Sequence, residues 1–334
     1  MNINELKIGS LTARVPVIQG GMGVGVSLSG LAGAVAAAGG IGVISTAQIG
    51  YRDADFDRNP IACNLKAIGE EIRKARAIAD GGIIGVNIMV ATKHYEEYVK
   101  AAVEAGVDII ISGAGLPMTL PSVSGDAMIA PIVSSKKSLA VISKYWSKKY
   151  DRKPDLVVIE GPKAGGHLGF QLEEIEAYTV AETKDYDEEI KAIIALADEM
   201  EVPVAVAGGI YERADMEHYL EMGAKAVQIA TRFVTTRECD ASEAYKQAYI
   251  DAKKEDIVLV KSPVGMPGRA IHNAFLDKVA QGERFMRGCR QCISTCKPET
   301  TPYCITEALV NAVKGNLDDG LILSGRNPCG EDKI

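Results

Sequence analysis

Eight short runs of small and β-branched apolar residues recur along this chain of 334 residues, and stretches with helical spacing separate them. The runs are Val15–Gln19, Ile41–Ser45, Ile83–Asn87, Ile109–Ser112, Ala130–Val133, Leu156–Glu160, Val204–Ala207 and Ala226–Ile229. Their apolar residues are continuous rather than alternating with polar ones, which is typical of strands covered on both faces, as in a parallel sheet. The fifth run is the weakest, because Pro131 lies inside it.

The stretches between the runs predict helices. Three of them, Ser27–Ala38, Tyr95–Ala105 and Ala214–Met222, are each followed by glycine, the residue that commonly ends a helix. A fourth, Asp187–Met200, carries apolar residues at helical spacing. Eight strands that alternate with helices favour an α/β fold, the closed (β/α)8 TIM barrel. An open doubly wound sheet is the alternative, because weak strands are easily miscounted.

The chain is longer than one barrel requires. We expect residues 1–235 to form the barrel and residues 236–334 to form a C-terminal extension that contains several cysteines. The extension holds a further apolar run, Ile257–Val260, a Gly/Pro-rich loop over residues 262–271 and a final helix from about Thr306 to Lys314. We interpret residues 262–271 as a substrate loop.

Charge and the N-terminal pattern exclude several classes of partner. The 37 basic and 44 acidic residues give a net charge of −7, so neither nucleic acid nor an anionic membrane is expected as a partner. The uncharged segment Leu28–Ile44 is rich in glycine and poor in leucine, which favours a buried helix and strand over a membrane span. Residues Met1–Gly9 lack the pattern of a signal peptide, so a cytoplasmic protein is expected.

Glycine-rich loops follow three of the predicted strands. They are Gly20–Gly23, Gly161–His167 and Ala207–Ile210. In a barrel the loops after the strands build the active site, and glycine lets a flat cofactor or a phosphate approach the backbone closely. Phosphate sites in this fold form after strands seven and eight, where Gly208-Gly209 and Ala230-Thr231 stand. The plainer alternative is that these glycines only turn the chain.

Several motifs, in order, resemble those of the nitronate monooxygenase family. They are VPVIQGGM at the start, GVNI around Asn87, AGGH at Ala164–His167, AGGI at Ala207–Ile210, QIATRF at Gln228–Phe233 and SPVGMPGRAI at Ser262–Ile271. The family includes the former 2-nitropropane dioxygenases and the FMN-dependent enoyl-acyl-carrier-protein reductases. The resemblance runs from about residue 10 to 275 and implies a (β/α)8 barrel with FMN over the C-terminal mouth.

The resemblance also implies which residues contact the flavin. Gly21 and Met22 would lie beside the isoalloxazine ring, and Asn87 would contact it. The complete set of expected cofactor-binding residues is Gly20, Gly21, Met22, Asn87, Gly165, Gly166, Gly208, Gly209, Gln228, Ala230 and Thr231. Ala230 departs from the family, which usually has glycine there, but alanine is small enough for the phosphate site to survive.

The candidate acid/base residue is His167. The chain has four histidines, and His94 and His218 lie in charged helical contexts typical of structural or exposed residues. His167 follows Gly165-Gly166 at a barrel strand end, and imidazole exchanges a proton near neutral pH. The resemblance places the family's acid/base residue at this position. His272 is less clear and is considered only as a substrate contact.

Four cysteines lie close together near the C-terminus. Cys289, Cys292, Cys296 and Cys304 fall within 16 residues, and thiolates suit both iron–sulfur clusters and zinc. A [4Fe–4S] cluster is the simplest interpretation in a flavin enzyme, with zinc and free thiols as alternatives. The odd total of seven cysteines argues against a disulfide framework. The remaining three, Cys63, Cys239 and Cys329, are expected to be ordinary thiols.

Three functions compete on this basis. The cysteines, together with the resemblance, favour a bacterial branch that carries out redox and isomerisation at the 2,3-bond of acyl-acyl-carrier-protein thioesters, in fatty acid biosynthesis. The alternative is oxidation of alkyl nitronates with oxygen. A purine nucleotide dehydrogenase is disfavoured, because no cysteine lies between Cys63 and Cys239. The expected partners are a small-molecule or carrier-bound substrate and acyl carrier protein, and a homodimer stays open.

Overall fold

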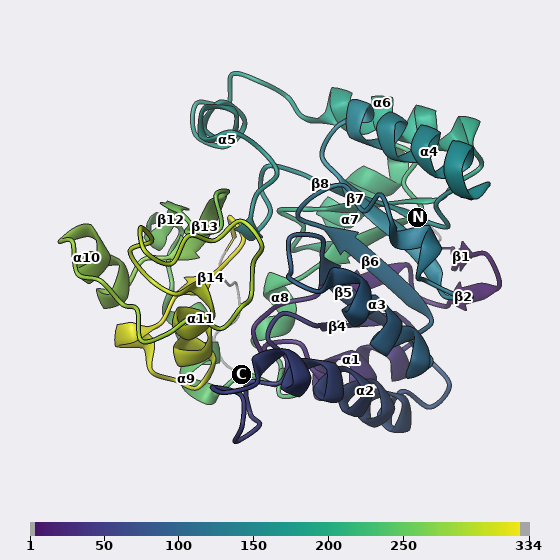
Figure 1. Cartoon of the computed structure of the whole chain (residues 1–334). Helices are drawn as coiled ribbons and strands as arrows, with labels where there is room; N and C mark the ends of the chain where they lie inside the picture. Colours follow the sequence, from purple (N-terminus) through teal and green to yellow (C-terminus); the bar gives the residue numbers. More distant parts are fainter. Residues whose placement is uncertain (1–3, 328–334) are drawn as a thin grey trace.

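The computed structural model describes residues 4–327, and its centre is a closed barrel of eight parallel strands (Figure 1). Around the barrel the strands are β3 (Val17–Gln19), β4 (Ile41–Ser45), β5 (Ile83–Met89), β6 (Ile109–Gly113), β7 (Met128–Val133), β8 (Val157–Glu160), β10 (Val204–Ala207) and β11 (Ala226–Ile229). Each contains one of the predicted apolar runs or most of it. The barrel is therefore confirmed, and the open sheet is wrong.

Helices surround the barrel. They are α1 (Ser29–Ala37), α2 (Pro60–Ala79), α3 (Tyr95–Glu104), α4 (Lys136–Tyr150), α6 (Asp187–Glu199), α7 (Arg213–Glu221) and the short α8 (Thr231–Val234). The four helices expected from sequence correspond to α1, α3, α6 and α7. In α4 the first turn is fixed by Ser135, whose side chain accepts a hydrogen bond from the Ser138 N–H at 3.2 Å. None of the helices in residues 4–327 is long and apolar enough to cross a membrane.

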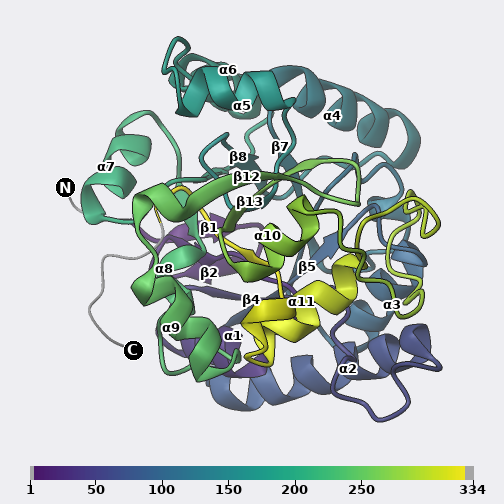
Figure 2. The same ribbon diagram turned by 90° about the vertical axis from the view of Figure 1, so that its left-hand side faces the viewer.

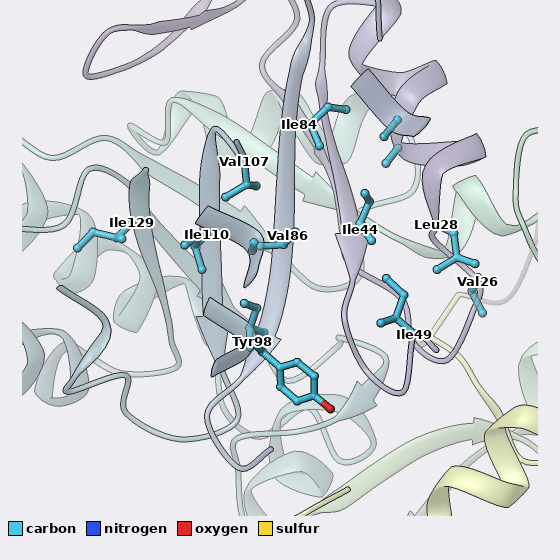
Figure 3. Close-up of a cluster of buried hydrophobic side chains, with 14 of the residues drawn as sticks. Val26, Leu28, Ile44, Ile49, Ile84, Val86, Tyr98, Val107, Ile110 and Ile129 are labelled. Carbon is cyan, nitrogen blue, oxygen red and sulfur yellow. The ribbon is translucent and has the colours of Figure 1, made fainter. Parts of the chain in front are cut away.

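Two apolar layers hold the barrel together. Side chains such as Ile44, Val86 and Ile110 fill the space between strands and helices (Figure 3). A separate inner layer, which includes Ile18, fills the barrel itself. The hairpin of β1 (Leu6–Ile8) and β2 (Leu11–Ala13) packs Leu6 and Ile8 onto that inner layer, at the end of the barrel away from the extension (Figure 1). One end is thereby closed, and only the other can hold a ligand.

The extension covers the carboxyl ends of the strands (Figure 2). Its elements are α9 (Glu243–Asp251), β12 (Ile257–Lys261), β13 (Pro267–Ile271), α10 (Ala274–Ala280), α11 (Ile305–Val313) and β14 (Ile322–Leu323). The predicted strand at Ile257–Val260 and the final helix are both present. A short strand from the barrel, β9 (Gly166–His167), pairs with β13 and joins the same sheet. The barrel and the extension therefore share one sheet. The domain boundary between residues 235 and 236 stays a prediction.

A half-buried cap also links the extension to the barrel. The Asp240 carboxylate accepts hydrogen bonds from the N–H groups of Leu28, Gly30 and Leu31, at 2.8, 3.1 and 3.1 Å. These N–H groups lie at the start of α1 and have no partner inside the helix. The residues after α8 therefore hold the helix that follows the first glycine-rich loop. By contrast, α5 (Leu172–Thr179) stands away from the barrel in Figure 1.

Candidate active site

A cavity of about 270 Å³ lies at the carboxyl ends of the strands, between barrel and extension. Loops after β3, β5, β8, β10 and β11 line it, together with residues of the extension. The sequence-predicted residues that line it are Gly20, Gly21, Met22, Asn87, Gly165, Gly166, His167, Gly208, Gly209, Gln228, Ala230 and Thr231. The fold thus brings all predicted flavin contacts and the predicted acid/base residue to one cavity, while their individual roles stay predictions.

The floor of the cavity is a polar layer at the top of the barrel. Strand register sets Glu160 and Gln228 on either side of Ala207, and Ser45 opposite Asn87. These side chains point the same way as the inner apolar layer, because every second residue of a strand faces the barrel interior. An apolar barrel interior therefore ends in two amide groups, one hydroxyl and one carboxyl.

The first glycine-rich loop packs directly on this floor. A Cβ on Gly21 would lie 2.4 Å from the Asn87 Cβ, so only glycine allows the approach. The Met22 N–H donates to Ser27 Oγ at 2.8 Å, which fixes the loop just before α1. The backbone of this loop is therefore packed against β5, two strands around the barrel from β3.

The loop after β10 adopts a conformation that favours glycine twice in succession. Gly208 and Gly209 have φ angles of +105° and +78°. A Cβ on Gly208 would lie 3.0 Å from the Gly161 carbonyl oxygen, and one on Gly209 would lie 2.8 Å from the Lys163 Cβ. This tight backbone stands beside Ala230 and Thr231 at the start of α8, which line the same cavity.

A segment of the C-terminal tail, Ser324–Asn327, closes this end of the cavity. The Gly325 N–H donates to Thr231 Oγ1 at 3.3 Å, and the Asn327 side chain donates to the Gly209 carbonyl at 3.4 Å. All four tail residues line the cavity. Sequence analysis missed this segment, because no motif or periodicity marks a tail that packs on loops a hundred residues earlier.

His167 is held through both its backbone and its side chain. Its backbone pairs with Gly268 of β13, and its Nε2 lies 2.7 Å from Ser262 Oγ. Arg269 is buried and donates to the carbonyl groups of Pro162, at 2.9 Å, and of Ala164, which fixes the rest of the loop. Burial lowers the pKa of His167 to about 4. The imidazole is therefore neutral at pH 7 and able to accept a proton.

The other three histidines do not line the cavity. His94 contacts Glu97 at 2.8 Å, and His218 contacts Asp187 at 2.8 Å, both at exposed positions. His272 is exposed and lies 3.0 Å from its carboxylate partner Asp277. The structural interpretation of His94 and His218 agrees with these contacts, and nothing in the structure places His272 against a substrate.

Glu160 is a second titratable group in the cavity, and sequence analysis did not single it out. It ends β8, lines the cavity, and no hydrogen bond or ion pair to its carboxyl is found within residues 4–327. Burial raises its pKa to about 7. The available signal was an acidic residue at the end of an otherwise apolar predicted strand.

Comparison with known proteins now adds to this geometry. A model of the nitronate monooxygenase family matches residues 4–333. The chain belongs to the nitronate monooxygenase family, and it is an oxidoreductase. A probable nitronate monooxygenase of Staphylococcus saprophyticus is 25% identical over 98% of this chain and 93% of its own length. One from Staphylococcus aureus strain Newman is 32% identical over 39% of this chain and 35% of its own.

Two solved structures share the fold of this chain. FabK from Thermotoga maritima superposes with a TM-score of 0.70 and 25% identity, over 96% of this chain and 88% of its own. Nitroalkane oxidase from Streptomyces ansochromogenes has a TM-score of 0.70 and 19% identity, over 93% of this chain and 89% of its own. The second likeness concerns the fold alone.

Of the four clustered cysteines, only Cys292 lines the cavity. Cys292 and Cys304 are buried, Cys296 is half-buried and Cys289 is exposed. Burial raises the pKa of Cys292, and negative charge on the other three raises it further, so all four lie within electrostatic range. As their side chains stand, no group of three or more His, Cys, Asp or Glu residues within 4–327 could hold a metal ion.

The remaining cysteines lie apart from this group. Cys63 and Cys239 are buried, and the Cys239 thiol donates to the Val26 carbonyl at 3.4 Å. Neither lines the cavity. Cys329 lies outside the described residues.

The shifted pKa of Glu160 predicts a pH-dependent stability difference. Folding raises this pKa from its ordinary value of 4.5 to about 7, so the folded state disfavours the carboxylate and wild type loses stability as pH rises across that window. Glu160→Gln has no such loss. In urea unfolding of the apoprotein, the variant should be more stable than wild type by about 3 kcal/mol at pH 8, with the gap closing near pH 4.5.

The matched control is Glu173→Gln, which changes an exposed carboxyl on α5. Its stability relative to wild type should not vary with pH. A gap between Glu160→Gln and wild type that stays constant from pH 4.5 to 8 would show that the Glu160 carboxyl is ordinary.

Proposed function

We propose that this protein is an FMN-dependent oxidoreductase that acts at the 2,3-bond of acyl thioesters carried by acyl carrier protein, with His167 as general acid/base. The observation that carries the proposal is a cavity with two unlike ends. One end is built from glycine-rich backbone and the polar barrel floor, and the other is apolar. The first suits a flavin nucleotide, and the second suits an acyl chain.

The glycine-rich end fits FMN by its shape. Gly208 and Gly209 line the cavity, and a side chain on either would clash with Gly161 or Lys163, so this loop presents bare backbone to the cavity, where a phosphate can bind. Gly21, Met22 and Asn87 lie on the same cavity, where a flat ring can approach the backbone. FMN bound there would supply the acceptor or donor for a hydride.

The apolar end is formed by the extension. Its lining side chains are Val264, Ile293, Ile305, Leu309 and Leu323, which also form part of the apolar core of the extension. A straight acyl chain gains free energy from burial on such a wall, about 0.8 kcal/mol for each CH₂ group. A short alkyl nitronate would use little of it.

His167 stands in the same cavity and is neutral at pH 7. For an acyl thioester, it would take the proton from the carbon next to the carbonyl, or return it in the reductive direction. Glu160 and the polar floor would meanwhile offer hydrogen bonds to the polar parts of a bound nucleotide. Oxidation of an alkyl nitronate is the second candidate, because the matching family and its curated relatives carry that name.

We propose in addition that Cys289, Cys292, Cys296 and Cys304 bind one [4Fe–4S] cluster. Their number, four, and their mutual electrostatic range support it, because thiolates are the usual ligands of such clusters. The exposed Cys289 and the half-buried Cys296 would have to turn inward when the cluster binds.

The phosphate site is tested by a charge placed within it. Ala230 already carries a Cβ at negative φ, so an aspartate adds no new backbone conflict there, and its carboxylate should repel a phosphate at the start of α8. Ala230→Asp should purify folded but without flavin absorbance near about 450 nm, even after incubation with FMN. Ala230→Ser, with a neutral side chain of similar size, should keep FMN. Full flavin occupancy in Ala230→Asp would place the phosphate elsewhere.

The reaction is tested with both substrate classes. Wild-type holoenzyme should turn over acyl or enoyl thioesters of acyl carrier protein, and His167→Gln should keep FMN but lose about 10²–10⁴-fold in kcat, the usual contribution of a general acid/base. His272→Gln is the control and should retain wild-type kcat. Turnover of alkyl nitronates with oxygen, but not of any acyl thioester, would decide for the second candidate.

The cluster is tested by metal analysis of anaerobically prepared protein. Wild type should hold about four irons and four sulfides per chain, and replacing any one of the four cysteines by serine should remove most of both. Cys63→Ser is the control and should keep them. One zinc per chain would indicate a structural zinc site instead, and no metal would leave four free thiols.

A further inference from the structure

The contact between His167 and Ser262 shows which ring nitrogen of His167 the protein itself holds. Nε2 of the imidazole lies 2.7 Å from Ser262 Oγ, and Ser262 is buried, with 6% of its surface exposed. A hydrogen bond of this length between buried groups excludes water as a competitor. One end of the ring is therefore occupied by the protein.

The other end of the ring is unoccupied. Within residues 4–327, Nδ1 of His167 has no hydrogen-bond partner, while the residue lines the cavity. The two nitrogens are chemically distinct, and the hydrogen bond at one of them determines which carries the proton in the neutral ring. Nδ1 is the nitrogen that a cavity ligand can reach.

The backbone that carries both hydrogen-bond partners is also fixed. The backbone of His167 pairs with Gly268, and that of Gly166 pairs with Arg269, in the antiparallel ladder between β9 and β13. Ser262 stands just after β12, the other neighbour of β13 in the sheet, so one small sheet carries both partners of the hydrogen bond. A second N–H, that of Val264, donates to the same Ser262 oxygen at 3.4 Å and orients the hydroxyl.

We propose that Ser262 is a positioning residue that accepts a hydrogen bond from Nε2–H of His167 and so presents Nδ1 as the proton-transfer atom. In the oxidative direction of the proposed function, the C–H bond next to the thioester carbonyl breaks and an N–H bond forms at Nδ1. The electron pair of that C–H bond would form the new double bond, and FMN, where bound in its oxidised form, would supply the acceptor for the hydride of the neighbouring carbon. Ser262 keeps its hydrogen bond throughout and stabilises the resulting imidazolium.

The tautomer is measured directly by NMR. Protein labelled with ¹⁵N-histidine and loaded with FMN gives separate nitrogen shifts for four histidines, and His167→Gln identifies the signals of His167. We expect the neutral ring of wild type to carry its proton on Nε2 only. Ser262→Ala should give a mixture of the two tautomers, and Ser262→Thr, which restores the hydroxyl, should return the wild-type pattern.

A nearby serine serves as the matched control. Ser134, just after β7, donates its hydroxyl to the carbonyl of Gly169, at 3.3 Å, two residues beyond His167, so Ser134→Ala removes a hydroxyl that holds the same loop without touching the ring. Its His167 shifts should equal those of wild type. A wild-type ring protonated on Nδ1, or a Ser262→Ala spectrum identical to that of wild type, would overturn the proposal.

Kinetics separates positioning from loss of structure. Ser262→Ala should lower kcat roughly 10- to 100-fold, as other losses of a histidine's orienting partner do, with KM and the Kd for FMN unchanged, and Ser262→Thr should recover most of kcat. The proton-transfer step at Nδ1 rests on the proposed function, whereas the hydrogen bond between Ser262 and Nε2–H of His167 does not. A protein that binds no FMN would refute that function, while the tautomer measured in the apoprotein would still decide the role of Ser262.

Discussion

Closure of the barrel is the constraint on which the other features of this protein depend. Because eight parallel strands run in one direction around a ring, their carboxyl ends meet at one mouth, and their loops share one cavity. The β1–β2 hairpin fills the opposite end with Leu6 and Ile8. The same closure sets the inward residues into layers, so that apolar side chains give way to Glu160, Gln228, Ser45 and Asn87 only at the mouth.

The extension converts this open mouth into an enclosed site. It does so by backbone pairing at His167, by the buried guanidinium of Arg269 on the loop after β8, and by the tail that packs on Gly209 and Thr231. Enclosure has an electrostatic consequence. Burial lowers the pKa of His167 and raises that of Glu160, so both groups are shifted toward their neutral forms. A cavity of this kind suits proton transfer to and from carbon, because a neutral imidazole shielded from water can meet the C–H bond directly.

The seam between barrel and extension also explains why the two parts are difficult to separate. β9 belongs to a barrel loop by sequence and to the extension sheet by hydrogen bonding, and Asp240 caps α1 from beyond the barrel. Gly165 has no room for a side chain, because a Cβ there would lie 2.6 Å from the Gly325 nitrogen. The glycine-rich loop Gly161–His167 is therefore also a packing surface for the tail.

The sequence by itself determined the strands, the barrel and the position of most candidate site residues. Continuous apolar runs and glycine after helices are local signals, and parallel strands carry their loops to the same end whatever the details. Only the tertiary structure showed that Glu160 and the tail Ser324–Asn327 line the cavity and that Ser262 contacts His167, because each of these positions depends on residues far along the chain. The Ser262 hydroxyl meets an imidazole 95 residues earlier, a distance in sequence over which no periodicity or spacing rule reports contact.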